Sequence, residues 1–168
     1  MKSLLILGAG GFGHMIKETA QALGYEEIVF LDDMVKEDDV IGMCCDYVIK
    51  HEEYPVAVAA FGNNKTRLFW TDKLLEEGYE VPAIVHPSAV VSPSVTLEPG
   101  CFIMQRSVVN TNTKIERAAL VNSGAVVDHN SVVCAGAHVG LGSVVKANCT
   151  IESGRKVEAG EVIFSTRR

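Results

Sequence analysis

The chain has 168 residues, enough for one ordinary domain or two small ones, and 48% of them are apolar. Its formal net charge of −6 argues against nucleic acid as a partner. No apolar stretch has transmembrane length, so we expect no membrane insertion. Five cysteines with no C-x-x-C pair indicate reduced thiols in a cytoplasmic protein, and we expect no metal site. Residues 1–83 have a charge balance of −8 and residues 84–168 a balance of +2, which makes the second half the better host for a polyanion.

The N-terminal half has the pattern of a Rossmann-like βαβ unit. An apolar run at 4–7 predicts a strand, a helix is expected up to Leu23 with Gly24 at its end, and 28–31 predicts a second strand. The loop between the first strand and the helix consists of Gly8, Ala9, Gly10, Gly11, Phe12 and Gly13. Backbone N–H groups of such a loop can approach a pyrophosphate at the helix N-terminus, although a tight turn without a ligand would have the same sequence.

Polar residues follow two of the expected strands. Asp32 and Asp33 come directly after the second strand, about twenty residues after the glycines. A short strand is expected at 47–49, and a buried strand at 56–61 ends at Gly62, Asn63 and Asn64. Either asparagine could cap the next helix, which is expected to run to about Glu77, or face a ligand at the strand ends. Residues 1–83 suffice for half of a dinucleotide fold, so a full NAD site is not expected.

The second half repeats every six residues from Ile84 onward. Its second slot is aliphatic fourteen times in phase, its sixth slot is small, and its fifth slot is mostly Gly, Asn or Ser, which accept a positive φ. A period of six fits neither a helix nor simple strand alternation. Each hexad instead suits a short extended segment and a corner, so that three hexads close one coil of a solenoid with a continuous aliphatic core. The second-slot residues are Val85, Val91, Leu97, Ile103, Val109, Ile115, Val121, Val127, Val133, Val139, Val145, Ile151, Val157 and Ile163.

This repeat resembles that of the hexapeptide-repeat acyltransferases, whose shared fold is a left-handed parallel β-helix. With the glycine-rich α/β half before it, the whole chain resembles one branch of that family, the bacterial sugar O- and N-acetyltransferases. These enzymes acetylate sialic acids or nucleotide-linked amino sugars for surface glycans. The most specific segment is Asn122-Ser-Gly-Ala-Val-Val-Asp-His129, which continues to His138 and Gly142.

The resemblance implies a role for each matching residue. His129 would be the general base, and His138 and Gly142 would contact the acetyl-CoA end. The glycine loop, Asp32, Asp33, Gly62, Asn63 and Asn64 would hold the sugar nucleotide. The implied division is a sugar-nucleotide-binding domain at 1–83 and an acyltransferase domain at 84–168.

The residues themselves support acetyl transfer. A neutral imidazole is suited to taking a proton near pH 7, and His129 occupies a fourth-slot corner rather than the core. Ala147 lies one coil of eighteen residues later, and its backbone N–H is a candidate donor to a developing oxyanion. His129 and His138 are nine residues apart, which predicts different corners of one subunit and a site shared between subunits of a homotrimer.

The chain departs from the family pattern in three places. Asn130 stands where the family usually has an acid after the base, so Asp128 is a second candidate for orienting the ring. Phe12 replaces a common histidine of the glycine loop. The repeat stops near Phe164 without a polar cap, which raises the expectation of a truncated solenoid in a piece of a longer multidomain protein.

Three functions are therefore weighed. The first is an acetyl-CoA-dependent acetyltransferase that acts on a nucleotide-linked sugar, at nitrogen or oxygen. The second is a non-catalytic sugar-nucleotide-binding and trimerising module of a larger glycan-synthesis enzyme. The third, least favoured, is a nicotinamide-cofactor protein that uses the glycine loop and Asp32.

Overall fold

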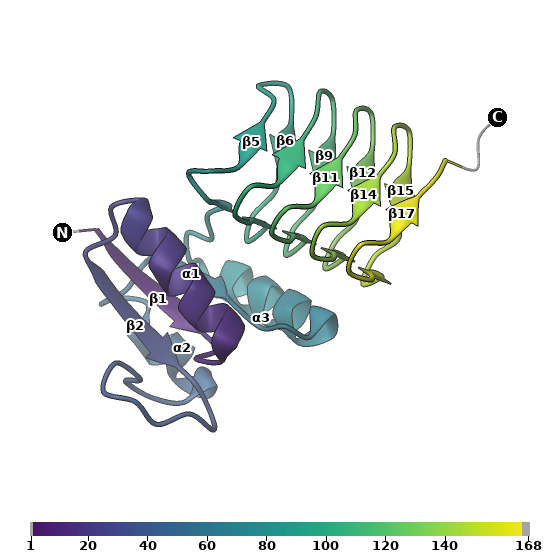
Figure 1. Cartoon of the computed structure of the whole chain (residues 1–168). Helices are drawn as coiled ribbons and strands as arrows, with labels where there is room; N and C mark the ends of the chain where they lie inside the picture. The colour runs from purple at the N-terminus through teal and green to yellow at the C-terminus, as the bar shows by residue number, and fades with distance from the viewer. Residues whose placement is uncertain (1, 166–168) are drawn as a thin grey trace.

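The computed structural model describes residues 2–165, as an α/β part followed by a β-solenoid (Figure 1). The α/β part consists of β1 (Ser3–Leu7), α1 (Gly11–Ala22), β2 (Glu27–Leu31), the 3-10 turn η1 (Cys44–Asp46), α2 (Tyr47–Lys50), β3 (Ala57–Ala59) and α3 (Asn64–Glu77).

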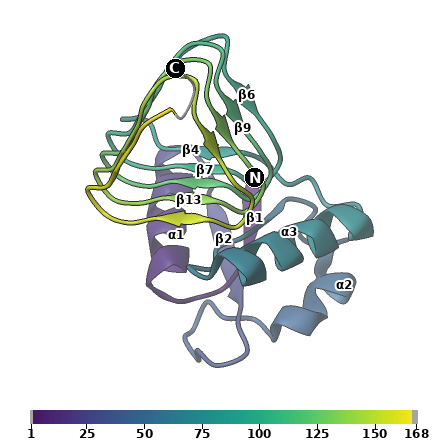
Figure 2. The same cartoon turned by 90° about the vertical axis from the view of Figure 1, so that its right-hand side faces the viewer.

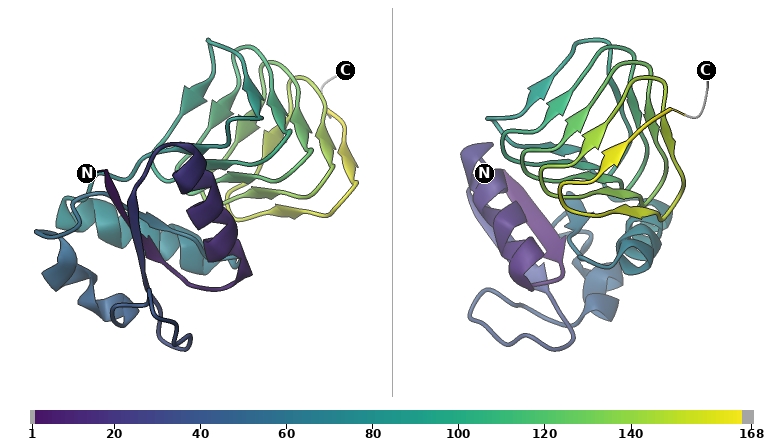
Figure 3. Two further views of the ribbon diagram at one scale, coloured as in Figure 1. Left: turned by 60° about the vertical axis from the view of Figure 1, so that its left-hand side comes forward. Right: turned by 45° about the vertical axis from the view of Figure 1, so that its right-hand side comes forward.

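Three parallel strands in the order β2-β1-β3 form the sheet of the α/β part. Strand side chains alternate between faces, so Leu4 and Ile6 pack with Ile16 of α1, whereas Leu5 and Leu7 pack with Leu74 of α3. The helices thus cover opposite faces of the sheet (Figure 3). The expected helices and strands of the βαβ unit are confirmed, including left-handed glycines at the helix ends, Gly24 with φ 82° and Gly78 with φ 94°.

The strand expected at 47–49 is wrong, because these residues begin the short helix α2. Their composition favours a strand, but the preceding turn overrides it. Asp33 Oδ1 accepts a hydrogen bond from the backbone N–H of Cys44 at 2.8 Å, and Asp46 Oδ2 accepts one from the N–H of Met43 at 2.8 Å. These side-chain acceptors start a helical turn that α2 continues.

The solenoid contains fourteen two-residue strands, one for each hexad, and each pairs in parallel with the strand eighteen residues away. They form three sheets, which we call the first face (β16-β13-β10-β7-β4), the second face (β17-β14-β11-β8-β5) and the third face (β15-β12-β9-β6). Figure 2 shows the triangular outline. The strands are Ile84–Val85, Val90–Val91, Thr96–Leu97, Phe102–Ile103, Val108–Val109, Lys114–Ile115, Leu120–Val121, Val126–Val127, Val132–Val133, His138–Val139, Val144–Val145, Thr150–Ile151, Lys156–Val157 and Val162–Ile163, numbered β4 to β17 in that order.

The slots of the repeat behave as the sequence predicts. Second-slot and sixth-slot side chains fill the interior, where Val127, Val145 and Cys149 belong to one core cluster. Every fifth-slot residue from Gly100 to Gly160 has a positive φ, including Asn112 (57°) and Asn130 (56°). Asn tolerates this geometry better than other non-glycine residues, which is why it recurs at these corners.

The first face packs against the α/β part (Figure 2). First-slot side chains point out of the solenoid, and Ile84, Phe102 and Leu120 join the cluster that contains Ile16 of α1. His138 and Lys156 are the next first-slot residues along this face. Among residues 2–165, none of the helices is long and apolar enough to span a bilayer.

Candidate active site

His129 lies in the turn after β11, on the edge between the second and third faces. Its side chain is exposed, as expected for a fourth-slot residue. Its ring Nδ1 lies 3.0 Å from Nδ2 of Asn130, the neighbouring fifth-slot residue. The ring is therefore held through Nδ1, and Nε2 is the nitrogen left to meet a substrate.

Asp128 is directed to the backbone rather than to the imidazole. Its Oδ1 accepts hydrogen bonds from the backbone N–H of His129 at 2.8 Å and from Nδ2 of Asn110 at 3.2 Å. The N–H of His129, and then Asn110, lower the pKa of the Asp128 carboxyl below its usual value. Among the described residues, the ring of His129 has a side-chain amide as its hydrogen-bond partner and no carboxylate.

The backbone N–H of Ala147 is a spare donor one coil after His129. Some fourth-slot N–H groups bond to a third-slot side chain, as Ser123 does to Oδ1 of Asn122 at 2.8 Å and His129 does to Asp128. The third-slot residue before Ala147 is Lys146, whose ammonium group has no acceptor. Within residues 2–165, the Ala147 N–H makes no hydrogen bond, as an oxyanion donor requires.

His138 is the first residue of β13 and lies on the first face, beside the α/β part. The expectation that it occupies a corner is wrong, because a first-slot residue lies within a strand. It is nevertheless separated from His129 by the third face, because β12 lies between the two residues along the chain.

The tautomer of His138 follows from its neighbours. Asn122 Oδ1 accepts from a backbone N–H, so Asn122 Nδ2 is the group that faces Nε2 of His138, at 3.1 Å. Nε2 must accept this bond, which leaves the proton on Nδ1. Burial, and then the charge of Arg67, lower the pKa of His138 to about 4, so the ring is neutral near pH 7. Nδ1 is buried and makes no hydrogen bond within the described chain.

Gly142 lies on a different edge, between the first and second faces, in the same hexad as His138. Its φ is 60°, and a Cβ built there would meet open space. In one subunit the expected site residues thus fall into two groups. Asp128, His129, Asn130 and Ala147 share the edge between the second and third faces, whereas His138 lies on the first face and Gly142 on the edge between the first and second faces.

The glycine loop has the geometry of a nucleotide-binding turn. Gly8 has a φ of 100°, and a Cβ on Gly13 would lie 2.0 Å from the carbonyl oxygen of Gly8, so only glycine allows α1 to pack this close to β1. Gly10 is the N-cap of α1, and Cβ atoms on Gly10 or Gly11 would meet open space. The backbone at the start of α1 is accordingly open to an anionic ligand.

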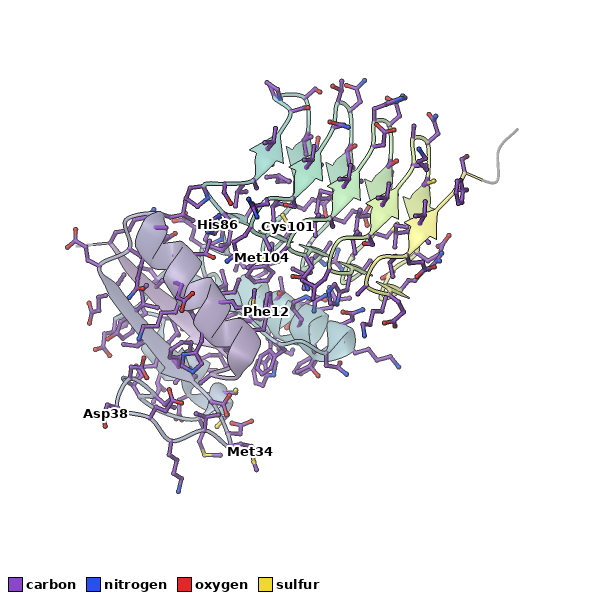
Figure 4. All side chains as sticks on the ribbon, viewed as in Figure 1. Phe12, Met34, Asp38, His86, Cys101 and Met104 are labelled. Atoms are coloured by element: carbon purple, nitrogen blue, oxygen red, sulfur yellow. The ribbon has the colours of Figure 1, made fainter. Side chains whose placement is uncertain are left out.

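Phe12 turns from this loop toward the solenoid (Figure 4). Its ring packs edge-on against Phe102 of β7 with the ring centroids 5.3 Å apart. The side chain thus helps to join the α/β part to the first face, and a ligand at the loop would meet its backbone.

Asp32 and Asp33 both hold loops in place. Asp32 accepts hydrogen bonds from the backbone N–H groups of Ala9, Met34 and Val35, each at 2.8 Å. Burial favours the protonated carboxyl, but these three donors outweigh it and lower the pKa of Asp32. Asp33 accepts from Cys44, as described above. Asp32 therefore fixes the glycine loop through Ala9.

Of the two roles that the sequence left open, Asn63 takes that of the helix cap, and contact with a ligand stays a prediction. Asn63 caps α3, with its Oδ1 accepting from the N–H of Thr66 at 3.0 Å. Asn64 Nδ2 donates to the carbonyl of Gly154 at 3.0 Å and so ties α3 to the solenoid. A pocket of about 390 Å³ opens here between the two parts of the chain. It is lined by Gly62, Asn63, Asn64, Lys65, Gly154 and Lys156.

Arg67 was not identified from the sequence. It is completely buried on α3, and its guanidinium donates to four backbone carbonyl oxygens, those of Ala118 at 2.8 Å, Phe61 at 2.9 Å, Gly136 at 3.1 Å and Ala137 at 3.5 Å. Arg67 is the third residue after Asn64, and the sequence predicts an exposed side chain there, because no neighbouring residue indicates burial. The available signal was a basic residue in the first turn of a helix, where the dipole disfavours it.

Known proteins share both parts of this chain. The PglD N-terminal domain family matches residues 3–74. PerB from Caulobacter crescentus, solved in complex with CoA and GDP-perosamine, is 29% identical, with a TM-score of 0.83 over 98% of this chain and 89% of that one. The acetyltransferase domain of PglB from Neisseria gonorrhoeae is 30% identical, with a TM-score of 0.75 over 98% of this chain and 92% of that one.

The fold also recurs at lower identity. WeeI from Acinetobacter baumannii is 15% identical, with a TM-score of 0.57 over 99% of this chain and 98% of that one, which is a likeness of fold alone. The solenoid matches the left-handed parallel β-helix of the acetyltransferases. With 30% identity across 92% of the PglB domain, the chain belongs to the hexapeptide-repeat sugar acetyltransferases.

Proposed function

We propose that this protein transfers the acetyl group of acetyl-CoA to the amino group of a nucleotide-linked amino sugar, for bacterial surface-glycan synthesis. The observation that carries the proposal is the match to PerB, which was solved with both CoA and GDP-perosamine and aligns along 98% of this chain. The α/β part, residues 1–83, would bind the sugar nucleotide, and the solenoid, residues 84–168, would be the acyltransferase domain.

The acceptor site is assigned to the carboxyl ends of β1, β2 and β3, where parallel sheets bind ligands. The open backbone at Gly10 and Gly11, which Asp32 holds through Ala9, suits a pyrophosphate. The pocket beside Gly62 and Asn63 also contains Lys65 and Lys156, and their charges complement an anion. Lys156 pairs in register with His138, so a sugar nucleotide in this region would lead toward the first face.

His129 is assigned as the general base. The amine of the sugar attacks the thioester carbonyl, the N–C bond forms, and Nε2 of His129 takes the proton that the amine loses. The C–S bond then breaks, and the CoA thiolate leaves with the electron pair and receives a proton. Asn130 holds the ring through Nδ1, which keeps Nε2 directed outward.

Two donors are candidates for the acetyl group, one at the backbone of Ala147 beside His129 and one at the buried Nδ1 of His138 on the first face. The Ala147 N–H and the Nδ1–H of His138 are both without a hydrogen-bond partner among the described residues. A neutral His138 can donate through Nδ1, because Asn122 occupies its other nitrogen. Such preorganised donors typically contribute about 10²–10³-fold each to kcat.

Acetyl-CoA is assigned to the solenoid. A pocket of about 570 Å³ follows the third face from Asn130, next to His129, and includes Asn148, Thr150 and the basic side chain of Arg155. It therefore begins beside the base, where the thioester has to lie.

A homotrimer would unite the two groups of site residues. Five first-slot valines form an apolar ladder along the second face, and Val90 is 62% exposed. This ladder consists of Val90, Val108, Val126, Val144 and Val162. The edge with His129 and the edge with Gly142 flank this face. Packing it against a neighbour in a three-fold assembly would bring one edge of each kind together. The five free thiols fit the reducing cytoplasm, where we place the protein.

The proposal is tested by a thermal-shift panel of UDP-, CMP- and GDP-amino sugars, acetyl-CoA and NADH. A ligand at 100 times its dissociation constant adds about 2.7 kcal/mol to stability, which raises Tm measurably. We expect a shift with acetyl-CoA and with at least one sugar nucleotide, and none with NADH. A shift with NADH alone would favour the nicotinamide reading and contradict the proposal.

A further inference from the structure

A row of fifth-slot side chains runs along the edge that carries His129. Ser94, Asn112, Asn130 and Asn148 occupy it at intervals of eighteen residues. Asn112 and Asn130 are hydrogen-bonded through their side-chain amides, with Nδ2 of Asn112 at 3.3 Å from Oδ1 of Asn130. Nδ2 of Asn130 in turn lies 3.0 Å from Nδ1 of His129. Two amides in series therefore end on the ring of the proposed base.

This relay has two senses that make the same two hydrogen bonds. In one sense Asn130 donates to Nδ1 of His129, which leaves the ring proton on Nε2. If both amides turn over, Asn130 presents its oxygen to an Nδ1–H group and donates its N–H to the oxygen of Asn112. The second sense leaves Nε2 unprotonated, which is the form that can accept a proton from a substrate.

We propose that Asn112 is a positioning residue that acts through Asn130 to select the tautomer of His129. The consequence for turnover rests on the proposed function, but the effect on the ring does not. In enzymes with a Ser-His-Asp triad, exchanging the orienting carboxylate for an amide yields the wrong tautomer and lowers kcat by about 10⁴-fold. Here two amides stand in series, so the outer one decides the direction of the inner one.

The local backbone suits this arrangement. Asn112 and Asn130 both have a left-handed φ, and the N–H of Asn112 is held by Oγ of Ser94 at 3.0 Å. Both side chains therefore leave the same edge in the same direction. The carboxylate of Asp128, on the same turn as His129, accepts from the backbone N–H of His129 and interacts electrostatically with His129 and with Lys146 one coil later.

Substitutions at 112 can impose each sense. Asn112→Asp offers an acceptor only, so Asn130 must donate to it and turn its oxygen toward His129. Asn112→Lys offers a donor only and imposes the opposite sense. Ser94→Asp adds the same charge one coil farther away, still able to accept from the Asn112 N–H, and serves as the matched control.

The readout is the ¹⁵N spectrum of the histidine rings in the full chain, recorded at about pH 9, well above the reference imidazole pKa of about 6.5. The His129→Gln spectrum assigns the signals. We expect Asn112→Asp to make the Nδ1–H tautomer of His129 the major form and Asn112→Lys to make it the minor form, with Ser94→Asp like wild type. Identical His129 signals in all four proteins would overturn the proposal.

Turnover supplies an independent readout. If between a fifth and a half of wild-type rings hold the reactive tautomer, Asn112→Asp raises kcat by about two- to fivefold with unchanged KM for both substrates. A tautomer shift in a protein that acetylates no sugar nucleotide would support the relay and count against the proposed function. Acetyl transfer without any change in the His129 tautomer would support the proposed function and count against the relay.

Discussion

The Nε–H of Arg67 donates to the carbonyl oxygen of Ala118 at 2.8 Å, which fastens α3 to a corner of the solenoid. The solenoid corners one coil before and one coil after Ala118 also contact α3. A Cβ on Gly100 would lie 2.9 Å from Cγ2 of Thr71, and Arg67 also reaches Gly136 one coil after Ala118. Helix α3 advances about 5.4 Å per turn and strands are spaced about 4.8 Å apart, so one helical turn accompanies each coil.

Arg67 is expected to be essential for stability. Arg67→Met leaves several buried carbonyl oxygens without a donor, at roughly 1–3 kcal/mol each, so unfolding should become easier by at least about 3 kcal/mol. Arg67→Lys keeps the charge but lacks the planar guanidinium group, so its unfolding free energy should lie between those of wild type and Arg67→Met. Lys73→Met, on the exposed side of the same helix, should change stability by less than about 0.5 kcal/mol. Chemical denaturation measures all three, and a loss below about 1 kcal/mol for Arg67→Met would refute the role.

Asn130→Asp should improve the base. A carboxylate can accept from Nδ1–H of His129 while Asn112 still donates to it, which stabilises the charged imidazolium that forms. We expect kcat to rise by up to roughly tenfold, or 1.4 kcal/mol, with slightly lower stability at this left-handed position.

Asp128→Asn is the matched variant, one residue before His129. Its amide oxygen can still accept from the N–H of His129, so kcat should stay within about threefold of wild type. Steady-state kinetics compares the two variants. If Asn130→Asp is silent and Asp128→Asn abolishes turnover, Asp128 is the orienting carboxylate instead.

His138 should make the folded chain sensitive to acid. Its pKa is about 4 in the folded state against a reference of 6.5, so the folded state binds fewer protons between these pH values. Stability is therefore lost as pH falls through this window, by about 2 kcal/mol after allowance for partial exposure of the ring.

The measurement is the difference in unfolding free energy between wild type and His138→Gln, because other groups titrate equally in both. As pH falls from 7 to 4.5, the unfolding free energy of wild type should decrease relative to that of His138→Gln. A difference that does not change with pH would show that His138 titrates normally in the folded chain.

The valine ladder predicts the oligomer. Light scattering should give three times the chain mass of 18.1 kDa at micromolar concentration. Val126→Asp places a charge in the middle of the ladder and should yield monomers, whereas Thr96→Asp on the third face should leave the trimer intact. A monomeric wild type would remove both the trimer and the shared site.

Much of the fold is legible in the sequence because its signals are local. The six-residue repeat assigns all fourteen solenoid strands, since each hexad carries its own inward aliphatic residue and its own corner residue. The glycine loop is likewise marked by residues that only a tight turn needs. The strand predicted at Tyr47–Ile49 was wrong because the conformation of this segment depends on Asp33, fourteen residues earlier. No local pattern reveals that dependence.

The candidate site was harder to predict from the sequence because its residues interact between neighbouring coils. His129 and Asn130 were identified, but the hydrogen bond from Asn112 joins residues eighteen positions apart. Arg67 reaches Gly136 across sixty-nine positions, so its burial appears only when both parts are assembled. The place of His138 on a face follows from its slot, and the spacing of nine to His129 concealed this.

The central claim is acetyl transfer from acetyl-CoA to a nucleotide-linked amino sugar with His129 as base. Its most direct test is mass spectrometry of GDP-, UDP- and CMP-linked amino sugars after incubation with acetyl-CoA and the protein. We predict an N-acetylated product from wild type, a kcat about 10²–10⁴-fold lower for His129→Ala, and an unaffected His51→Gln control. No acetylated product from any of these sugars, or a His129→Ala variant with more than half of wild-type turnover, would contradict the account.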